Sequence, residues 1–391
     1  MYPLIVLKPK KEFSVQRFHP WVFSGAIDLI DDQIKDGDFV QVVDAKHNFL
    51  GYGVFQERGS ISVRLMSFDK NTVPDADFIQ QRLFIAFALR EQLGLISENN
   101  TICRLVHGEG DGLPGLIIDF YHHHFVIQAH STYAYQHLEA IASAIHTHFG
   151  KGVKSIYSKS EETMHSAEAV DEFIFGSDPS CIALENGIKY NIDWITGQKT
   201  GFFIDQRENR SLLRSMSEGK RVLNTFSYSG GFSLSASYGG ASEVVSLDSS
   251  QKALDLAEEN YAINQVGGNH KCINADALDY VKSSEANGYD IVVLDPPAFA
   301  KHQKARHNAI QAYKRLNVNA LKGIKHNGYL MTFSCSQVID KYLFQNTITA
   351  AAIEAKRNVK ILTQMHQPAC HPINIFHPEG EYLKGLLLHV S

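Results

Sequence analysis

One cysteine stands between two serines in the stretch TFSCS, residues 332–336, at the end of the apolar run GYLMTF. A thiolate in that position can act as a nucleophile. Three aspartates, Asp248, Asp276 and Asp295, also close apolar or mixed runs that have the length of strands. A buried, inert thiol is the structural alternative for Cys335, but a thiol and three carboxylates in comparable positions favour a catalytic site.

A glycine turn comes before these aspartates. The run RVLN is followed by TFSYSGGF, and Asp248 lies 248 − 230 = 18 residues after Gly230. An acid about 20 residues beyond such a turn is placed to accept hydrogen bonds from a ribose, and Asp276 could receive the amine of an adenine. Phe226 and Tyr228 occupy positions where a dinucleotide site needs glycines to approach a pyrophosphate. A nucleoside cofactor without phosphate, S-adenosylmethionine, therefore fits better.

The segments around these residues alternate between strand-like and helix-like patterns from about residue 186. The apolar runs RVLNTF, EVVSLD, YDIVVLD and GYLMTFS are separated by amphipathic stretches such as QKALDLAEENYAINQ. This alternation predicts parallel strands covered by helices on both faces. Such doubly wound sheets bind ligands beyond the carboxyl ends of their strands, where the aspartates and Cys335 are expected.

Two further regions precede this domain. Residues 1–70 read as a small β module with short strands VVD, AKHN, FLGYGVF and SISVRLMSF. Its start, KPKKEFSVQRFHPWVFSG, mixes cations with Phe18 and Trp21, which suits RNA binding, although a solvated charged edge beside core aromatics explains it equally well.

Residues 71–185 begin with a helix, PDADFIQQRLFIAFALREQLG, continue with a hairpin through LPGLIIDFY and FVIQAH, and then with the helix-like AYQHLEAIASAIHTHF. The histidines 122–124 between the two runs are expected to form a polar turn, and no metal site is predicted.

Length, composition and charge limit the classes of protein to which the chain can belong. A chain of 391 residues is expected to form two or three domains, and its 44% hydrophobic and 20% charged content is that of a globular protein. The net charge of −5 argues against a surface coated for nonspecific nucleic-acid binding. Five widely spaced cysteines indicate neither disulfides nor zinc. No secretory signal or bilayer-spanning run is recognised, which predicts a cytoplasmic location.

In order and spacing, RVLNTFSYSGGF, VVSLDSS, NADA, LDPPAFAK and TFSCS resemble the class I S-adenosylmethionine-dependent RNA methyltransferases that make 5-methylcytosine. The nearest resemblance is to the bacterial 23S rRNA large subunit methyltransferase I family. GQKTGFFIDQRENR is similar to that family's additional cofactor motif, RFHPWVFSGAI to the opening of its PUA domain, and DGLPGLIID to the start of its central sheet. The resemblance implies an α/β fold: a PUA-like RNA-binding domain (1–70), a small central α/β domain (71–185) and a Rossmann-like methyltransferase domain (186–391).

The resemblance also implies roles for individual residues. Carbon 5 of cytosine is a weak nucleophile, so an enzyme first adds a nucleophile to carbon 6, and Cys335 is the expected one. Asp295 is expected to protonate or hydrogen-bond ring nitrogen 3. The expected cofactor residues are Thr200, Asp205, Arg207, Phe226, Ser227, Gly230, Asp248, Ser249, Asp276, Ala277 and Asp295, and the expected substrate residues are Pro296, Pro297, Phe299, Lys301, Lys304 and Arg306.

Two other functions remain open on the sequence. An amino-group methyltransferase acting on RNA or protein has an aromatic residue after the two prolines, where this chain has Ala298. A non-catalytic RNA-binding assembly factor would not need the intact aspartates and Cys335. The proline motif has no second cysteine, so product release requires another base or water. The partner is RNA, and the assembly state is left open, with a homodimer among the alternatives.

Overall fold

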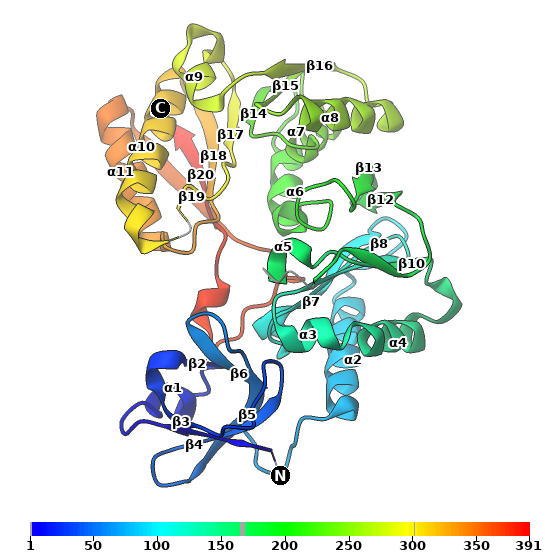
Figure 1. The fold of residues 1–391 in the computed structure, drawn as a ribbon. Coiled ribbons are helices and arrows are strands. Elements are labelled where there is room, and N and C mark those ends of the chain that lie inside the picture. The colour runs from blue at the N-terminus through cyan, green and yellow to red at the C-terminus, as the bar shows by residue number, and fades with distance from the viewer. Residues whose placement is uncertain (1, 165–168, 301) are drawn as a thin grey trace. The chain divides into compact units, whose positions relative to one another are not determined.

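The computed structural model describes residues 2–164, 169–300 and 302–391. The chain forms two compact units. The first contains residues 1–183, 192–202 and 369–380, and the second contains residues 184–191, 203–368 and 381–391. Figure 1 labels most of their helices and strands.

The first unit begins with a six-stranded sheet in the order β2-β6-β5-β4-β1-β3. Only β1 and β4 pair in parallel, and a core of aliphatic side chains such as Val40, Val42 and Leu65 fills one side. The expected β module is therefore present, except that AKHN is a turn: the amides of Lys46 and Asn48 bond to the Asp44 carboxylate. The elements are β1 (Leu4–Leu7), α1 (Phe13–Gln16), β2 (Trp21–Phe23), η1 (Ser24–Ala26), β3 (Ile27–Ile30), β4 (Phe39–Val43), β5 (Phe49–Phe55) and β6 (Ile61–Ser67).

A five-stranded sheet, β11-β10-β9-β8-β7, forms the rest of the first unit. The predicted helix before it, α2, begins at Ala76, two residues after the predicted start at Pro74, because the Asp75 side chain caps it by accepting from the amide of Phe78 at 2.8 Å. The expected hairpin is β8 and β9, with His122 and His123 in the turn at positive φ. The sheet starts one strand earlier than expected, at β7. The elements are α2 (Ala76–Gln92), β7 (Ile102–His107), η2 (Gly108–Asp111), β8 (Leu116–Tyr121), β9 (His124–Ala129), α3 (Thr132–Gln136), α4 (Leu138–Phe149), η3 (Gly150–Gly152), β10 (Ser155–Ser158), α5 (Glu161–Met164) and β11 (Glu172–Phe175).

The second unit is built on a seven-stranded sheet in the order β16-β15-β14-β17-β18-β20-β19. The five strands from β16 to β18 are parallel, whereas β20 and β19 are antiparallel additions at one edge. The sequence predicted the parallel part and missed this edge pair. The strands are β14 (Arg221–Thr225), β15 (Glu243–Asp248), β16 (Asn269–Asn274), β17 (Ile291–Leu294), β18 (Gly328–Ser334), β19 (Val359–Met365) and β20 (Lys384–Val390).

Helices cover both faces of this sheet, which confirms the doubly wound fold (Figure 1). Neighbouring strand residues alternate between two cores: Val222 packs with Leu213 and Phe232 of α6 and α7, and Leu223 packs with Leu316 of α10 and its neighbours. Near-continuous apolar strands result because both faces are buried. The remaining elements are β12 (Ser180–Glu185), β13 (Ile188–Asp193), η4 (Ile204–Gln206), α6 (Arg207–Ser215), α7 (Gly231–Tyr238), α8 (Gln251–Asn264), α9 (Ala277–Lys282), η5 (Ser284–Ala286), η6 (Gln303–Ala305), α10 (Arg306–Gly323), α11 (Lys341–Ala355) and η7 (Pro378–Gly380).

Two connections were not expected from the sequence. β12 and β13 form a separate two-stranded sheet. The chain passes from the first unit to the second within β12 and returns to the first unit within β13. Residues 369–380, between β19 and β20, belong to the first unit, where the carbonyl of Cys370 accepts a 2.8 Å hydrogen bond from the buried Arg90. Among the described residues, no helix is long and apolar enough to cross a membrane.

Candidate active site

The carboxyl ends of β14, β15, β17 and β18 carry the polar residues that the sequence analysis selected. β14 lies between β15 and β17, so the order of the strands along the chain reverses at this point of the sheet. A crevice is expected at such a switch point. The glycine turn follows β14, Asp248 closes β15, Asp295 follows β17, and Cys335 follows β18.

The loop after β14 is held in an unusual backbone conformation. Phe226, Tyr228 and Gly230 have positive φ angles of 54°, 44° and 78°. The carboxylate of Asp248 fixes the loop, because its two oxygens accept 2.9 Å hydrogen bonds from the amides of Tyr228 and Ser250. Side chains at positive φ cost about 1–3 kcal/mol each and often mark functional sites.

Ser227 provides a test of whether a cofactor fits this loop. Its amide donates to the carbonyl of Leu247, but its buried hydroxyl oxygen has no hydrogen-bond partner among the described residues. A buried hydroxyl without a partner is costly, so a polar ligand group would be expected beside it. The residues of the loop thus fit a nucleoside cofactor. Packing also favours glycine at position 230, because a Cβ there would lie 3.1 Å from the Cβ of Ala257.

The other expected cofactor residues on this edge, Asp276, Ala277 and Ser249, differ in their hydrogen bonding and in their exposure to solvent. Asp276 is the N-cap of α9, where its carboxylate accepts from the amide of Asp279 at 3.1 Å. A capping role and a ligand role are compatible because one carboxylate has two oxygens. Ala277 is buried and Ser249 is exposed.

The residues of GQKTGFFIDQR are divided between the two units. Thr200 is buried in the first unit, where its hydroxyl lies 2.5 Å from Asp119 and 2.8 Å from the hydroxyl of Tyr121. In the second unit, Asp205 accepts a 2.8 Å hydrogen bond from Tyr382. Arg207 is buried with its Nε 3.7 Å from Glu185, which also forms a two-point ion pair with Arg210. These expected cofactor residues therefore take part in buried polar networks.

Cys335 and the proline motif lie at neighbouring strand ends. The sulfur of Cys335 is 4.0 Å from the carbonyl oxygen of Pro296. Ser336, the next residue, is buried and its hydroxyl donates to the carbonyl of Ala300 at 2.5 Å. These two contacts tie the loop after β18 to the loop after β17, so Cys335 and Asp295 lie at one edge of the sheet.

Tyr313 of α10 is a member of this cluster that the sequence analysis missed. Burial raises the pKa of its phenol to about 12, and the charges of Cys335 and Asp295 raise it further, which indicates that the three groups are neighbours. Its ring packs against Phe299 with ring centroids 4.7 Å apart. The phenol is therefore neutral at physiological pH. Its only signal in the sequence was its position on the apolar face of the helix.

Lys384, at the start of β20, was also missed. It is 6% exposed and lies directly opposite Ser334, the residue before Cys335. Its ammonium donates to the carbonyls of Ser336 and Tyr382 at 2.7 and 2.6 Å. A lysine at the head of the apolar run KGLLLHV is an uncommon pattern and could have drawn attention.

Residues 300–315 after the prolines, AKHQKARHNAIQAYKR, contain lysines and arginines but no acidic residue, and some of these cations are paired with acids elsewhere in the chain. Arg306 lies 3.9 Å from Asp340, and Lys314 forms a 2.7 Å ion pair with Glu354. Lys304 and Pro297 are exposed. Lys301, also expected to contact substrate, lies outside the described residues.

A separate cleft lies in the first unit, between the β module and the central sheet. It has a volume of about 230 Å³ and adjoins a second hollow of about 350 Å³, and both are lined by Phe18, Met66, Phe68 and Arg82. Phe376 contributes to the first, with its ring 5.2 Å from that of Phe18.

Two features of this cleft are unusual. Phe18 has a positive φ of 64° at the end of α1, and its ring is about half exposed. The guanidinium of Arg82 lies 5.0 Å from the ring of Phe78, but among the described residues it has neither a hydrogen bond nor an ion pair. The cleft thus presents aromatic faces and available cationic donors.

Two family models match the chain. Residues 165–368 match S-adenosylmethionine-dependent methyltransferase, and residues 5–68 match PUA-like domain. These regions correspond to most of the second unit and to the six-stranded β module.

Curated relatives match over nearly the full length. The chain is 38% identical to "Ribosomal RNA large subunit methyltransferase I" of Photobacterium profundum over 396 residues, covering 99% of each chain. It is 38% identical to the protein of the same name in Shewanella frigidimarina, again with 99% coverage of each.

Solved structures show the same fold. A Streptococcus mutans protein assigned as a SAM-dependent methyltransferase superposes with a TM-score of 0.86 at 24% identity, covering 99% of this chain and all of that one. A second structure, assigned as a methyltransferase and complexed with SAH, gives a TM-score of 0.87 at 24% identity with the same coverage.

Proposed function

Because the chain belongs to the ribosomal RNA large subunit methyltransferase I family, we propose that it methylates carbon 5 of a cytosine in 23S rRNA, with Cys335 as the nucleophile. S-adenosylmethionine is its cofactor and RNA is its substrate. The choice of carbon 5 and the covalent step are the parts proposed here.

The observation that carries the proposal is the proximity of Cys335 to the Asp295–Pro296 loop. The 4.0 Å contact between the Cys335 sulfur and the Pro296 carbonyl brings a thiol beside a carboxylate-bearing loop at the switch point of the sheet. A nucleophile for carbon 6 and an acid for ring nitrogen 3 must act on one pyrimidine ring, which requires such proximity. Methylation of an amino group would need no thiol.

The Cys335 thiolate forms a bond to carbon 6, and the Asp295 carboxyl donates a hydrogen bond or proton at nitrogen 3 as charge develops there. When bound, the cofactor supplies the methyl group that carbon 5 receives. A base then removes the proton from carbon 5, the bond between carbon 6 and sulfur breaks to restore the thiolate, and a proton placed on nitrogen 3 returns to the Asp295 carboxylate.

The cleft in the first unit supports an RNA substrate. Sequence-tolerant RNA binding relies on aromatic faces on which bases stack and on cations that meet phosphates. Phe18, Phe68 and Phe376 supply the rings, and Arg82 supplies a guanidinium that forms no hydrogen bond or ion pair among the described residues. Exposed Arg17 directly precedes Phe18 in the sequence, and exposed Lys10 and Lys11 lie in the same N-terminal segment before α1. We therefore propose that single-stranded rRNA passes over this cleft.

The test compares wild type with Cys335→Ala, using S-adenosylmethionine with a labelled methyl group and unmodified 23S rRNA. The nucleosides are then separated and identified by mass. The proposal expects 5-methylcytidine from wild type and none from the variant. Label on an amino nitrogen, or an active variant, would replace it with amino-group methylation. No transfer together with no cofactor binding would favour an assembly factor.

Two further expectations accompany this function and remain predictions. A cytoplasmic location is expected for an enzyme that acts on rRNA. A homodimer is one candidate assembly state, which light scattering on the purified protein would measure.

A further inference from the structure

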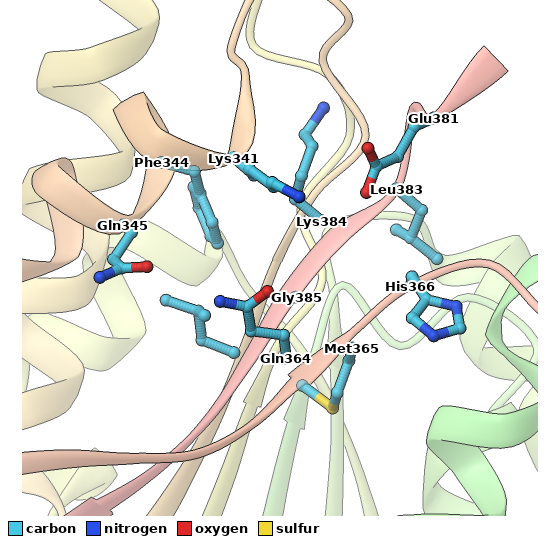
Figure 2. A pocket seen from close by; sticks show the side chains of 11 residues that line it. Lys341, Phe344, Gln345, Gln364, Met365, His366, Glu381, Leu383, Lys384 and Gly385 are labelled. Atoms are coloured by element: carbon cyan, nitrogen blue, oxygen red, sulfur yellow. The ribbon is translucent and has the colours of Figure 1, made fainter. Parts of the chain in front are cut away.

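Lys384 is a buried cation at the end of the strand next to the one that presents Cys335. β18 and β20 pair in antiparallel fashion, with Ser334 opposite Lys384. The lysine lines a small pocket of about 50 Å³ together with Lys341 and Glu381 (Figure 2). No role in the chemistry has so far been given to it.

The hydrogen bonds of Lys384 suit an ammonium ion rather than a neutral amine. An ammonium has three donors and no acceptor. Two carbonyl oxygens, of Ser336 and Tyr382, lie 2.7 and 2.6 Å from its nitrogen. Among the described residues, no carboxylate lies within ion-pair distance of it. A buried cation without a counter-ion is costly, so an anion that forms nearby during the reaction would be stabilised.

The charged groups around Lys384 point to the identity of that anion. Burial lowers the pKa of Lys384 to about 8, while Cys335 first, and then Glu381 and Asp340, raise it. The influence is mutual, because a thiolate that favours the ammonium is itself favoured by it. With a pKa of about 8, Lys384 carries its charge at neutral pH.

Two other ionisable groups near Cys335, Tyr313 and Asp295, supply no positive charge. Tyr313 is neutral, because its pKa lies near 12. Asp295 carries a negative charge when ionised, and a carboxylate beside a thiol raises the pKa of the thiol. Lys341 is exposed, and its ammonium lies 5.9 Å from the centroid of the Tyr342 ring.

We propose that Lys384 is a positioning residue whose buried ammonium stabilises the thiolate of Cys335 and so keeps the nucleophile reactive at neutral pH. This inference rests on the proposed function of Cys335 as the nucleophile. The contacts that carry it are the pairing of Ser334 with Lys384 and the hydrogen bond from Lys384 to the Ser336 carbonyl. Through that carbonyl, Lys384 also holds the backbone directly after Cys335.

The test measures the rate at which iodoacetamide alkylates each cysteine between pH 5.5 and 9.5, read peptide by peptide by mass spectrometry. Wild type, Lys384→Met, Lys384→Arg and the control Lys341→Met are compared. An unperturbed thiol titrates near pH 8.5. We expect a lower midpoint for Cys335 in wild type and in the control. In Lys384→Met, the midpoint should rise by about one unit or more, which is about a tenfold loss of reactivity at pH 7.

Cys272 is an internal reference in every sample. Burial raises the pKa of its thiol to about 11, so it should react slowly throughout. If Lys384→Met merely loosened the fold, Cys272 and Cys335 would both react faster, opposite to the proposed effect on Cys335. Lys384→Arg keeps the charge and is expected to recover at least part of the low midpoint.

Methylation assays add a second readout. The turnover of Lys384→Met should fall about tenfold at pH 7 and recover towards the wild-type value near pH 9, where the thiol ionises without help. An unchanged Cys335 midpoint in a folded Lys384→Met protein overturns the inference. That result differs from failure of the proposed function, in which Cys335→Ala would still methylate RNA whatever the midpoint.

Discussion

The sulfur of Cys335 lies 4.0 Å from the carbonyl oxygen of Pro296, although the two residues are 39 positions apart in the chain. Parallel pairing of β17 with β18 produces this contact, because Leu294 is paired with Thr332 and the two loops leave the sheet side by side. The loops are also joined by the hydrogen bond from the Ser336 hydroxyl to Ala300. A site fixed by neighbouring strands keeps its geometry better than one built on a free loop.

Replacement of Cys335 by alanine should abolish cytosine methylation. The expected loss of turnover is on the order of a thousandfold or more, because the variant lacks the thiol that we propose bonds to carbon 6. Incorporation of labelled methyl groups into unmodified 23S rRNA measures it. Cys272→Ala is the matched control, since Cys272 lies on β16 and bonds weakly to the carbonyl of Leu254 at 4.0 Å. Equal activity of the two variants would contradict a thiol nucleophile.

Asp248→Ala should weaken cofactor binding. The two oxygens of Asp248 hold the amides of Tyr228 and Ser250 at 2.9 Å, and a hydrogen bond to a charged group contributes about 1.5–3 kcal/mol. We expect a loss of affinity of about 10-fold to 100-fold for S-adenosylmethionine by calorimetry. Asp255→Ala removes an exposed acid from the neighbouring helix α8 and should bind as wild type. Unchanged affinity in Asp248→Ala would remove it from the cofactor site.

Arg82→Met should weaken RNA binding without affecting the cofactor. If Arg82 meets one phosphate, the slope of the logarithm of affinity against the logarithm of salt concentration should decrease by about one. Filter binding of rRNA fragments at several salt concentrations measures this slope. Lys46→Met, in the turn between β4 and β5, removes the same charge outside the cleft. A similar change in both variants would mean that only the net charge matters.

Phe18→Ala tests stacking in the same cleft. Loss of a stacked base costs about 1–3 kcal/mol by alanine substitution and does not depend on salt. The variant should therefore show lower affinity for RNA with an unchanged salt slope. Phe13→Ala is the control, because Phe13 is another exposed phenylalanine, at the start of α1, that does not line the cleft. Wild-type affinity in Phe18→Ala would exclude a stacking role.

The doubly wound sheet could be predicted because each parallel strand forms an apolar run between helical stretches. The edge strand β19 could not, since residues 360–364 are all exposed and Lys360, Thr363 and Gln364 interrupt the apolar pattern. The predicted helix over residues 134–149 is broken at His137, whose ring nitrogen bonds to the carbonyl of Tyr133. Such a local break depends on a side-chain contact that periodicity does not reveal.

The site was predictable to the extent that its residues end strands. Asp248, Asp295 and Cys335 stand out because polar side chains close apolar runs at a common edge. Tyr313 and Lys384 do not, since Tyr313 lies in the middle of α10 and Lys384 begins an antiparallel strand. Their approach to Cys335 depends on tertiary packing, in which residues from α10 and β20 meet the end of β18. The roles proposed for all five remain predictions.

His270 should make the protein less stable in mild acid. Burial lowers the pKa of its imidazole to about 4, and the ring stacks on Tyr261 at 3.5 Å while its Nε2 lies 2.9 Å from the Ser246 hydroxyl. The unfolded chain binds a proton near pH 6.5, whereas the folded chain resists it until about pH 4. Protonation therefore favours the unfolded state, and stability falls as pH decreases from about 6.5 to 4.

His270→Phe keeps an aromatic ring against Tyr261 but cannot titrate. On unfolding in acid, the variant should therefore take up about one proton fewer than wild type. Urea unfolding at pH 7.5 and at pH 4.5 measures the effect, and the decrease in unfolding free energy between the two should be smaller in the variant than in wild type. The slope of that free energy against pH reports the number of protons taken up, and the expected difference is at most about one. His326→Phe, at an exposed position before β18, should retain the wild-type slope. If His270→Phe also kept the wild-type slope, the acid sensitivity would have to come from other buried imidazoles such as His371, whose pKa is likewise lowered by burial.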